Sequence, residues 1–469
     1  MPINFLSIVL IGMIAYIFCR KNTIHHKFIE LLSLTIVVHI SAIRGYFLLV
    51  GKSSEVSYDV AMSFVLFLFC VYYLFEEHFV INKKGLIWGY GFLIVAIISV
   101  FYEQFFPYKN LIMDSATSGI NWDAYIFGLP EGIKSYATIK LSRLITYFVI
   151  ATSYFFALLI AKSSMTKDDL FYIIKKVKCI FPYIIVLGLG EYLSKNYFGG
   201  DLYETFMELI FGTGSGTFTD LIERGEGYQL QGLSNEPAHF SFMLYWGITF
   251  LLIEHKVLTQ TSFSLKEKIE ILLMIILMYL SGSFSTYVYF IILLSFIFWI
   301  YQSQISSHFL KSLLIIMGTM ILVGMVYIFT TAIDASSYLG QRIASVYDSI
   351  DLISIGTVSG VGGSSVLARL VSIYDTAWDF LQRPLLGLGP TVQISHGVFV
   401  NFLSDVGLIG LFFWCKATFS VHHYKLIPIV ILLLLPNIFM GVLTISTAFA
   451  SYTIFVVASF RDSWASNEN

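Results

Sequence analysis

Four side chains that suit chemistry on a charged substrate lie within one stretch, residues 368–411: Arg369, Arg383, His396 and Asp405. In a largely apolar chain, charged groups near a membrane are costly and are usually functional. Arginine stays charged and grips two oxygens of one anion, and histidine near its ordinary pKa can accept a proton. The stretch therefore predicts a site for an anionic substrate, with His396 as the first choice of general base.

A second set of candidates precedes the apolar run that begins near residue 237. Ser234-Asn235-Glu236-Pro237 is typical of a helix start, with a polar cap and an early proline. A helix amino terminus attracts anions, and Arg224 lies shortly before it. Glu236 and His239 are three residues apart and share a helix face, which makes them alternative bases. Helix capping and dipole complementation are the purely structural alternative for this pair.

Arg342 lies between these two sets, on the pattern of a helix that rests on the membrane surface (residues 338–351). We expect it either to assist anion binding or to bind lipid headgroups. A second helix is expected over residues 366–381, ending before Pro384 because a proline forces the preceding residue out of helical geometry. Arg383 then either binds the anion or caps that helix through carbonyl contacts.

The elements that must position these residues are membrane helices. With 57% hydrophobic and 12% charged residues and a mean hydropathy of +0.79, the 469 residues predict an all-α, polytopic membrane protein that forms a single integral membrane domain, residues 1–469. Twelve or thirteen transmembrane helices are expected. The apolar runs are 3–19, 28–50, 57–75, 85–101, 141–161, 179–194, 237–254, 268–281, 284–301, 309–331, 397–415, 425–440 and 443–460.

Basic residues predict the orientation of these spans. Seventeen of the 28 lysines and arginines fall in alternate short loops, which should be cytoplasmic. Three long loops then face outward, residues 102–140, 195–236 and 332–396, and the last is the main catalytic loop. The net charge of −2 excludes a strongly basic nucleic-acid binder, and the four cysteines have no metal or disulfide spacing, so no metal or cofactor is expected.

Two packing features are expected within the span that follows His396. Gly407 and Gly410, at small-residue spacing, predict close helix packing. Asp405 is expected to be a partner of Arg342 or Arg383. Other charges near span ends are few: Arg44, Arg143 and Glu191.

Short motifs in these stretches are similar to the O-antigen polymerase and ligase superfamily, the Wzy and WaaL proteins. Arg369-Leu-Val-Ser-Ile373 matches an Arg-x-x-x-Leu motif with Ile in place of Leu. His396-Gly397, nine residues and then Gly407-Leu-Ile-Gly410 match a later motif of the ligases, with Gly in the second place. The segments Gly387 to Pro390 and Asn235 to His239 resemble polymerase sequences.

The resemblance implies a metal-independent glycosyltransferase that takes glycan from polyprenyl diphosphate at the outer face of the bacterial cytoplasmic membrane. Arg224 and Arg369 would hold the diphosphate, Arg342 or Arg383 would assist, and His396 would deprotonate or orient the acceptor hydroxyl. Partners would be lipid-linked oligosaccharides, membrane lipids, and the chain-length regulator and flippase of the same pathway.

Three functions remain open at this point. A polymerase is favoured over a ligase that delivers glycan to a lipid A core, because the sequence marks no site for such an acceptor. A lipid-linked oligosaccharide flippase or other transporter is the alternative from another class. Transporters usually have internal repeats and place charges or broken helices at mid-membrane, and the sequence shows no such repeat.

Overall fold

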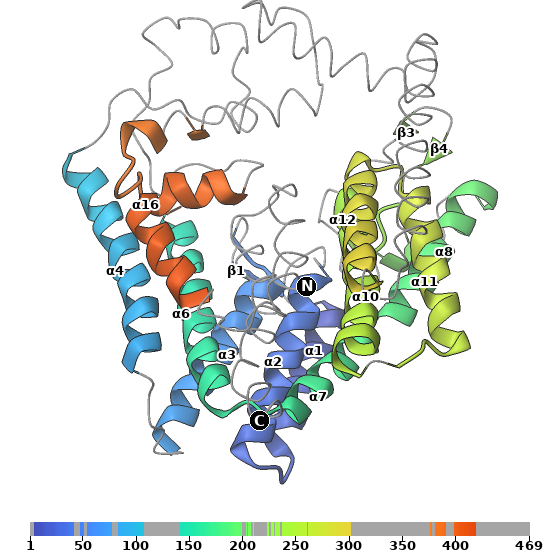
Figure 1. The fold of residues 1–469 in the computed structure, drawn as a ribbon, viewed down its shortest axis with the longest axis horizontal. Helices are drawn as coiled ribbons and strands as arrows, with labels where there is room; N and C mark the ends of the chain where they lie inside the picture. Colours follow the sequence, from blue (N-terminus) through green and yellow to red (C-terminus); the bar gives the residue numbers. More distant parts are fainter. Residues whose placement is uncertain are drawn as a thin grey trace, which may run out of the picture.

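The computed structural model describes ten longer stretches and several short ones. These are residues 4–41, 47–50, 54–76, 83–106, 141–198, 203, 205–207, 210, 223–224, 227–228, 230–234, 237–259, 261–301, 376–377, 380–390 and 398–418. Within this part the chain is mostly helical, with two short antiparallel ribbons (Figure 1). Three helical stretches here are long and apolar enough to cross a membrane, Tyr58–Glu76, Ile87–Phe105 and Leu144–Ala161, and two shorter helices are apolar.

Ten of the thirteen expected spans coincide with helices in the described part of the chain. The other three, residues 309–331, 425–440 and 443–460, lie outside it. The expected pair 268–281 and 284–301 is two separate helices, divided by Gly282 with a φ of 63°.

The expected span over residues 28–50 is wrong in its second half. The helix ends at Ile40, where Ser41 donates its hydroxyl hydrogen to the carbonyl of Val37. Residues 48–50 instead form strand β1 (Leu48–Val50), which pairs antiparallel with β2 (Ser54–Val56). An apolar run in a strand and one in a helix look alike by hydropathy, and the hairpin partner decides between them.

One group of helices is built mainly from the first third of the chain and one late helix (Figure 1). Its members are α1 (Phe5–Cys19), α2 (Ile24–Ile40), α3 (Tyr58–Glu76), α4 (Lys83–Phe105), α6 (Leu141–Ser164) and α16 (Val398–Thr418). α3 packs on α2 and α6, and α16 packs along α4. The α16 pairing brings the region of the predicted catalytic stretch onto a helix some 300 residues earlier.

A second group surrounds one buried helix. Its members are α8 (Phe181–Tyr197), α10 (Pro237–Leu252), α11 (Leu265–Leu280) and α12 (Phe284–Tyr301), and α10 continues into a π-helical turn, η3 (Ile253–Leu258). Every residue of α10 except Phe242 is buried. A helix that is apolar on all sides belongs in the centre of a bundle, so α10 is the core of this group.

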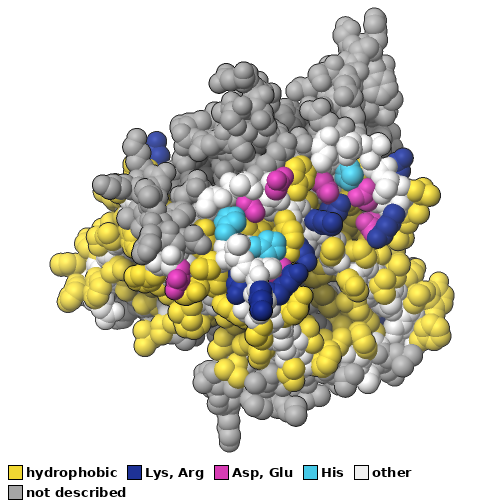
Figure 2. Space-filling view, turned by 90° about the horizontal axis from the view of Figure 1, so that it is seen from below, with side chains coloured by type: hydrophobic (Ala, Val, Ile, Leu, Met, Phe, Trp, Pro, Cys, Tyr) yellow, Lys and Arg dark blue, Asp and Glu magenta, His cyan; other side chains and the backbone are white. Residues whose placement is uncertain are grey.

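We distinguish the two ends of the bundle by their residues. The basic end carries Arg20, Lys178 and Lys266, and the loop end carries the start of α10, the end of α4 and the end of α8. Charged and histidine side chains gather on the face seen from below, with hydrophobic side chains around them (Figure 2). The basic end was predicted to be cytoplasmic and the loop end to face outward.

The amphipathic helix α7 (Lys167–Lys178) joins the two groups at the basic end, since it contacts both α2 and α10 (Figure 1). A capping box between Thr166 and Asp169 starts the helix. Four of its apolar residues are buried, namely Leu170, Ile173, Ile174 and Val177.

Candidate functional site

The expected span over residues 397–415 is a broken helix rather than a continuous one. Gly407 has φ 62° and ψ −168°, so α16 is divided there into two helical parts. The first part leaves carbonyl groups without helical partners. A turn from residues 380–390 supplies the donors, because the Leu388 amide donates to the Ser404 carbonyl (2.6 Å) and the Gly389 amide to the Asp405 carbonyl (3.0 Å).

The second part of α16 begins with amides that need acceptors, and the same turn provides these. The Leu408 amide donates to the Pro384 carbonyl (2.9 Å) and the Ile409 amide to the Leu385 carbonyl (3.2 Å). Broken helices are tolerated in apolar surroundings only where other groups satisfy the freed backbone atoms. The turn therefore completes the broken helix on both sides of the break.

Glycines make this close approach possible. A β-carbon at Gly407 would overlap the backbone of Leu385 and Leu386, and one at Gly387 would overlap the backbone of Ser404 and Asp405. Gly387 also has a φ of 71°, which favours glycine. The prediction that Gly407 serves close helix packing is therefore corrected, since its conformation and the inserted turn require it. Gly410 does lie close to another helix, where its β-carbon would meet Val95 of α4 at 3.4 Å.

The Gly-Leu-Gly-Pro segment consequently has a structural role in the described part of the chain. The amides of Gly387, Leu388 and Gly389 all donate to backbone carbonyls, of Arg383, Ser404 and Asp405 respectively. Ser99 of α4 donates its hydroxyl hydrogen to the carbonyl of Leu386. These amides are not directed at an external anion.

Arg383 fastens the turn to the loop end of α4. One guanidinium nitrogen donates to the Phe106 carbonyl (2.8 Å), and another lies 3.4 Å from the Tyr102 hydroxyl. Its Nε lies 3.7 Å from the Glu103 carboxylate, which is only 1% exposed, and the guanidinium lies over the Tyr102 ring at 4.9 Å. Arg383 thus contacts a carbonyl, as in the structural alternative, although the carbonyl belongs to the residue that directly follows α4 rather than to its own helix. Its helix ends at Gln382, as the following proline predicts.

Glu103 was missed because residues 102–140 were predicted to form an outer loop. α4 continues to Phe105. The available signal was helical spacing, because Glu103 follows Ser99 by four residues and Val95 by eight, on the side that packs against α16 and the turn.

Asp405 is buried in the first part of α16, with 3% exposure. It was expected to pair with Arg342 or Arg383. Arg383 forms an ion pair with Glu103, and Arg342 lies outside the described residues.

At the start of α10, His239 is 7% exposed and lies in the first turn after Pro237. Arg224 lies in the two-residue strand β3 (Glu223–Arg224), which pairs with β4 (Gly227–Tyr228). Among the candidate residues, His239 and Arg383 therefore come from different helix groups. Four others, Arg342, Arg369, Glu236 and His396, lie outside the described residues.

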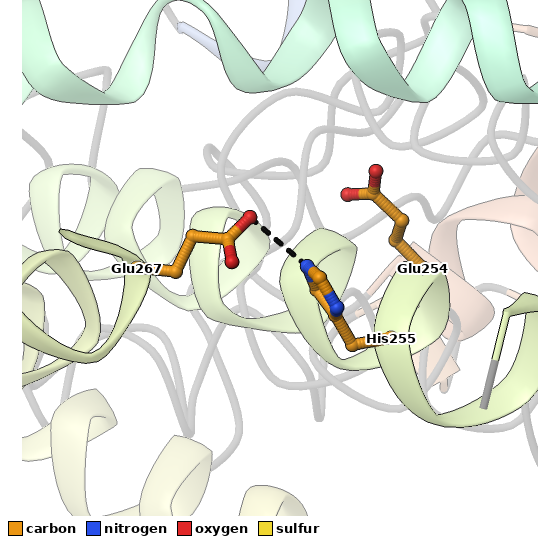
Figure 3. Close-up of side chains that lie close together, drawn as sticks. All are labelled: Glu254, His255 and Glu267. Atoms are coloured by element: carbon orange, nitrogen blue, oxygen red, sulfur yellow. Dashed lines mark hydrogen bonds and ion pairs between the residues drawn. The ribbon is translucent and has the colours of Figure 1, made fainter. Parts of the chain in front are cut away.

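A second cluster of titratable groups lies at the basic end, where none was proposed. The Glu267 carboxylate and the His255 ring face each other at 2.9 Å, with the Glu254 carboxylate beside them (Figure 3). One possible ligand atom from each residue lies within 4.8 Å of the others, an arrangement that a divalent cation can use. However, the Lys178 ammonium already pairs with both Glu254 and Glu267. We therefore assign these four residues to an ion-pair network.

The charges of this network shift the pKa values of its members. Partial burial acts to raise the pKa of Glu267, but hydrogen bonds from the Ser264 backbone, His255 and Lys178 lower it to about 2. Burial acts to lower the pKa of Lys178, and its hydrogen bonds to Glu254 and Glu267 raise it overall. The cluster ties α7, η3 and α11 together at the basic end.

The other end of α7 is held by a similar set of contacts. His25 of α2 lies 3.0 Å from the Asp169 carboxylate, and Tyr172 donates to Glu30 of α2 at 2.8 Å. Burial acts to raise the pKa of Asp169, but hydrogen bonds from His25 and Thr166 lower it. Arg20 also pairs with Glu30, at 2.9 Å.

Comparison with known proteins adds no assignment: no family model matches the sequence, and no curated protein is significantly similar to it.

Proposed function

We propose that the chain is a polysaccharide repeat-unit polymerase for O-antigen, capsular polysaccharide or exopolysaccharide. In this reaction glycan is transferred from polyprenyl diphosphate to a sugar hydroxyl of a second lipid-linked repeat unit. The proposal rests on the motif resemblance together with one feature of the fold, the turn that completes the broken helix α16.

That feature supports the proposal through the position of the candidate base. The first part of α16 begins at Val398, two residues after His396, and the turn of residues 384–389 fixes this part by backbone hydrogen bonds. Arg383 and Ser99 hold the turn against the loop end of α4. A general base has to be held within hydrogen-bond reach of its proton, and a rigid element next to His396 meets this need.

In the proposed reaction the acceptor hydroxyl oxygen attacks the anomeric carbon of the donor glycan from the face opposite the leaving group. The bond from that carbon to the phosphate oxygen breaks, polyprenyl diphosphate leaves with the bonding electrons, and the hydroxyl proton passes to His396. Arg224 and Arg369 hold the diphosphate, with Arg342 assisting. Charge-assisted hydrogen bonds contribute about 1.5–3 kcal/mol each, so such arginines can stabilise the leaving group without a metal.

Arg383 has the weakest claim to contact substrate. Its guanidinium already contacts Glu103, Tyr102 and Phe106. We therefore assign it to positioning of the turn and keep the direct anion contacts for the other arginines.

The broken helix favours a second candidate, a lipid-linked oligosaccharide transporter, because transporters often build their sites at helix breaks. In those sites the unwound backbone coordinates the cargo or a coupling ion. Here the freed groups at Ser404, Asp405, Leu408 and Ile409 bind the inserted turn. This occupancy makes the transporter the weaker alternative. A ligase that uses the same donor remains an alternative with the same chemistry at the anomeric carbon.

The test is reconstitution of the purified protein with polyprenyl-diphosphate-linked repeat units in the presence of EDTA, with products separated on a gel. The parent should make a ladder, and Arg369→Ala and His396→Ala should abolish it. Lys268→Ala is the matched control, because this exposed residue lies at the basic end. A folded parent that makes no ladder with the right repeat unit would refute the polymerase.

A deletion of the gene in cells distinguishes a polymerase from a ligase. Loss of a polymerase leaves single repeat units on the lipid core, whereas loss of a ligase leaves no glycan there. Ladders that persist in Arg369→Ala and His396→Ala would refute the residue assignments while leaving the reaction standing.

A further inference from the structure

A buried ion pair lies at the loop end of α8, apart from the turn and the ion-pair network described above. Lys195 donates to the Glu191 carboxylate at 2.6 Å, and their side chains are 7% and 1% exposed. Burying two charges costs several kcal/mol per ion before their attraction is counted. Such a pair in an apolar helix therefore calls for a reason beyond the stability of α8.

The Glu191 carboxylate is also bound to a segment of chain 40 residues later. The Gln231 amide donates to its two oxygens at 3.0 and 3.1 Å, and the Gly232 amide donates at 2.6 Å. Two consecutive amides that donate to one group suit a carboxylate, because both of its oxygens can accept hydrogen bonds. Lys195 balances the charge that this arrangement needs.

Further contacts hold the same segment between α8 and α10. Tyr203 donates its hydroxyl hydrogen to the Gly232 carbonyl (2.9 Å), and its own amide donates to Ser194 of α8 (3.2 Å). Gly232 has a φ of 56°, and a β-carbon there would overlap the Phe240 ring of α10. A β-carbon at Gly188 of α8 would also meet that ring, at 2.6 Å. The turn is thus packed against Phe240, on the helix that carries His239.

The segment held in this way adjoins two candidate residues. β4 contacts α8 and pairs with β3, in which Arg224 lies, so the Arg224 ribbon sits against the helix that carries Glu191. On the other side, the turn leads within a few residues into α10, whose first turn contains His239. One buried carboxylate therefore joins α8 to both.

We propose that Glu191, with Lys195 as its counterion, is a positioning residue that fixes the Arg224 ribbon and the start of α10 for binding of the donor diphosphate. The inference rests on the proposed function. Glu191 itself does not contact substrate, because its oxygens face Lys195 and the two amides. Its effect reaches the substrate through Arg224.

The test compares Glu191→Gln with the parent in the reconstituted polymerisation assay, varying the concentration of the lipid-linked donor. A glutamine would direct an NH2 group at the amides or at Lys195, so the ribbon should shift. We expect the KM for the donor to rise about ten- to hundredfold, because this is the effect of losing roughly one charge-assisted hydrogen bond. The change in kcat should be much smaller. Glu270→Gln, which alters a carboxylate paired with Lys266 at the basic end, should change neither.

A double-mutant cycle separates positioning from a general loss of stability. In an Arg224→Ala background, Glu191→Gln should raise the KM little further, because both changes remove the same contact. Hydrogen exchange at the Gln231 and Gly232 amides should be faster in Glu191→Gln. If that variant does not fold, Lys195→Met gives the same comparison, because it leaves the carboxylate without its counterion.

The outcomes are distinct. The positioning role would be overturned if the parent and Glu191→Gln had equal KM values, or if the effects of Glu191→Gln and Arg224→Ala on KM were fully additive. The proposed reaction would still stand in that case, because the parent makes a ladder. A folded parent without any ladder would overturn the proposed function, and this inference with it.

Discussion

Replacing Gly407 with alanine tests whether the inserted turn completes α16. At φ 62° and ψ −168° the residue lies in a region that is almost exclusive to glycine, and a side chain there costs about 1–3 kcal/mol. The added methyl would also overlap the Leu385 backbone, so the turn has to withdraw. Losing the hydrogen bonds from Leu408 and Ile409 would cost about 0.5–1.5 kcal/mol each. Together these effects predict a loss of about 2–6 kcal/mol.

The assay is equilibrium unfolding in mixed micelles of increasing SDS fraction, followed by circular dichroism, with hydrogen exchange as a second measurement. Gly407→Ala should unfold at a lower SDS fraction, and the amides of Leu388 and Leu408 should exchange faster. Gly12→Ala is the control, because no heavy atom lies within 4 Å of the added β-carbon and alanine suits a helix better than glycine. If Gly407→Ala unfolds like the parent and both amides stay protected, the reasoning about the break is wrong.

Three further predictions concern the contacts that hold the helices together. Arg383→Met should destabilise the protein by about 1–3 kcal/mol, because it removes the guanidinium beside the buried Glu103 carboxylate. Adding Glu103→Gln should recover part of this loss in the same titration, and no recovery would argue against the pair. The pKa of Glu267 is about 2 in the folded protein against an ordinary 4.5, so its stabilising effect is complete above pH 4.5 and is lost as the pH falls toward 2. The thermal midpoint should therefore drop more between pH 6 and pH 3 in the parent than in Glu267→Gln, and equal drops would contradict this. Thr166→Ala should cost about 1 kcal/mol through loss of the capping box, measured by the same unfolding, and an unchanged midpoint would show that α7 does not depend on its cap.

The positions of most helices could be predicted because each needs only a local run of apolar residues. The break in α16 could not, since a glycine inside such a run is compatible with a straight helix. What decides its conformation is a turn about 20 residues earlier that supplies donors and acceptors to the broken backbone. The hydropathy of the α16 segment alone does not indicate that these backbone groups bind the turn.

The candidate residues show the same limit. The types of residue suited to chemistry could be read directly from the sequence, and for Arg383 the sequence left both anion binding and helix capping open. Its partner Glu103 is 280 residues away in sequence, and Glu191 is 40 residues from the amides that it binds. Such pairings follow from how helices pack, and neither spacing nor composition reports them.

The placement of α7 has a mechanical consequence. Its ion pairs bind α2 at one end of the helix and η3 and α11 at the other, all at the basic end. α10 has 16 residues, or about 24 Å at 1.5 Å per residue. A tilt of about 10° pivoting on α7 would therefore displace the far tip of α10 by roughly 4 Å. A small angular change at the basic end is in this way converted into a larger displacement at the loop end, where His239 and Arg383 lie in different helix groups.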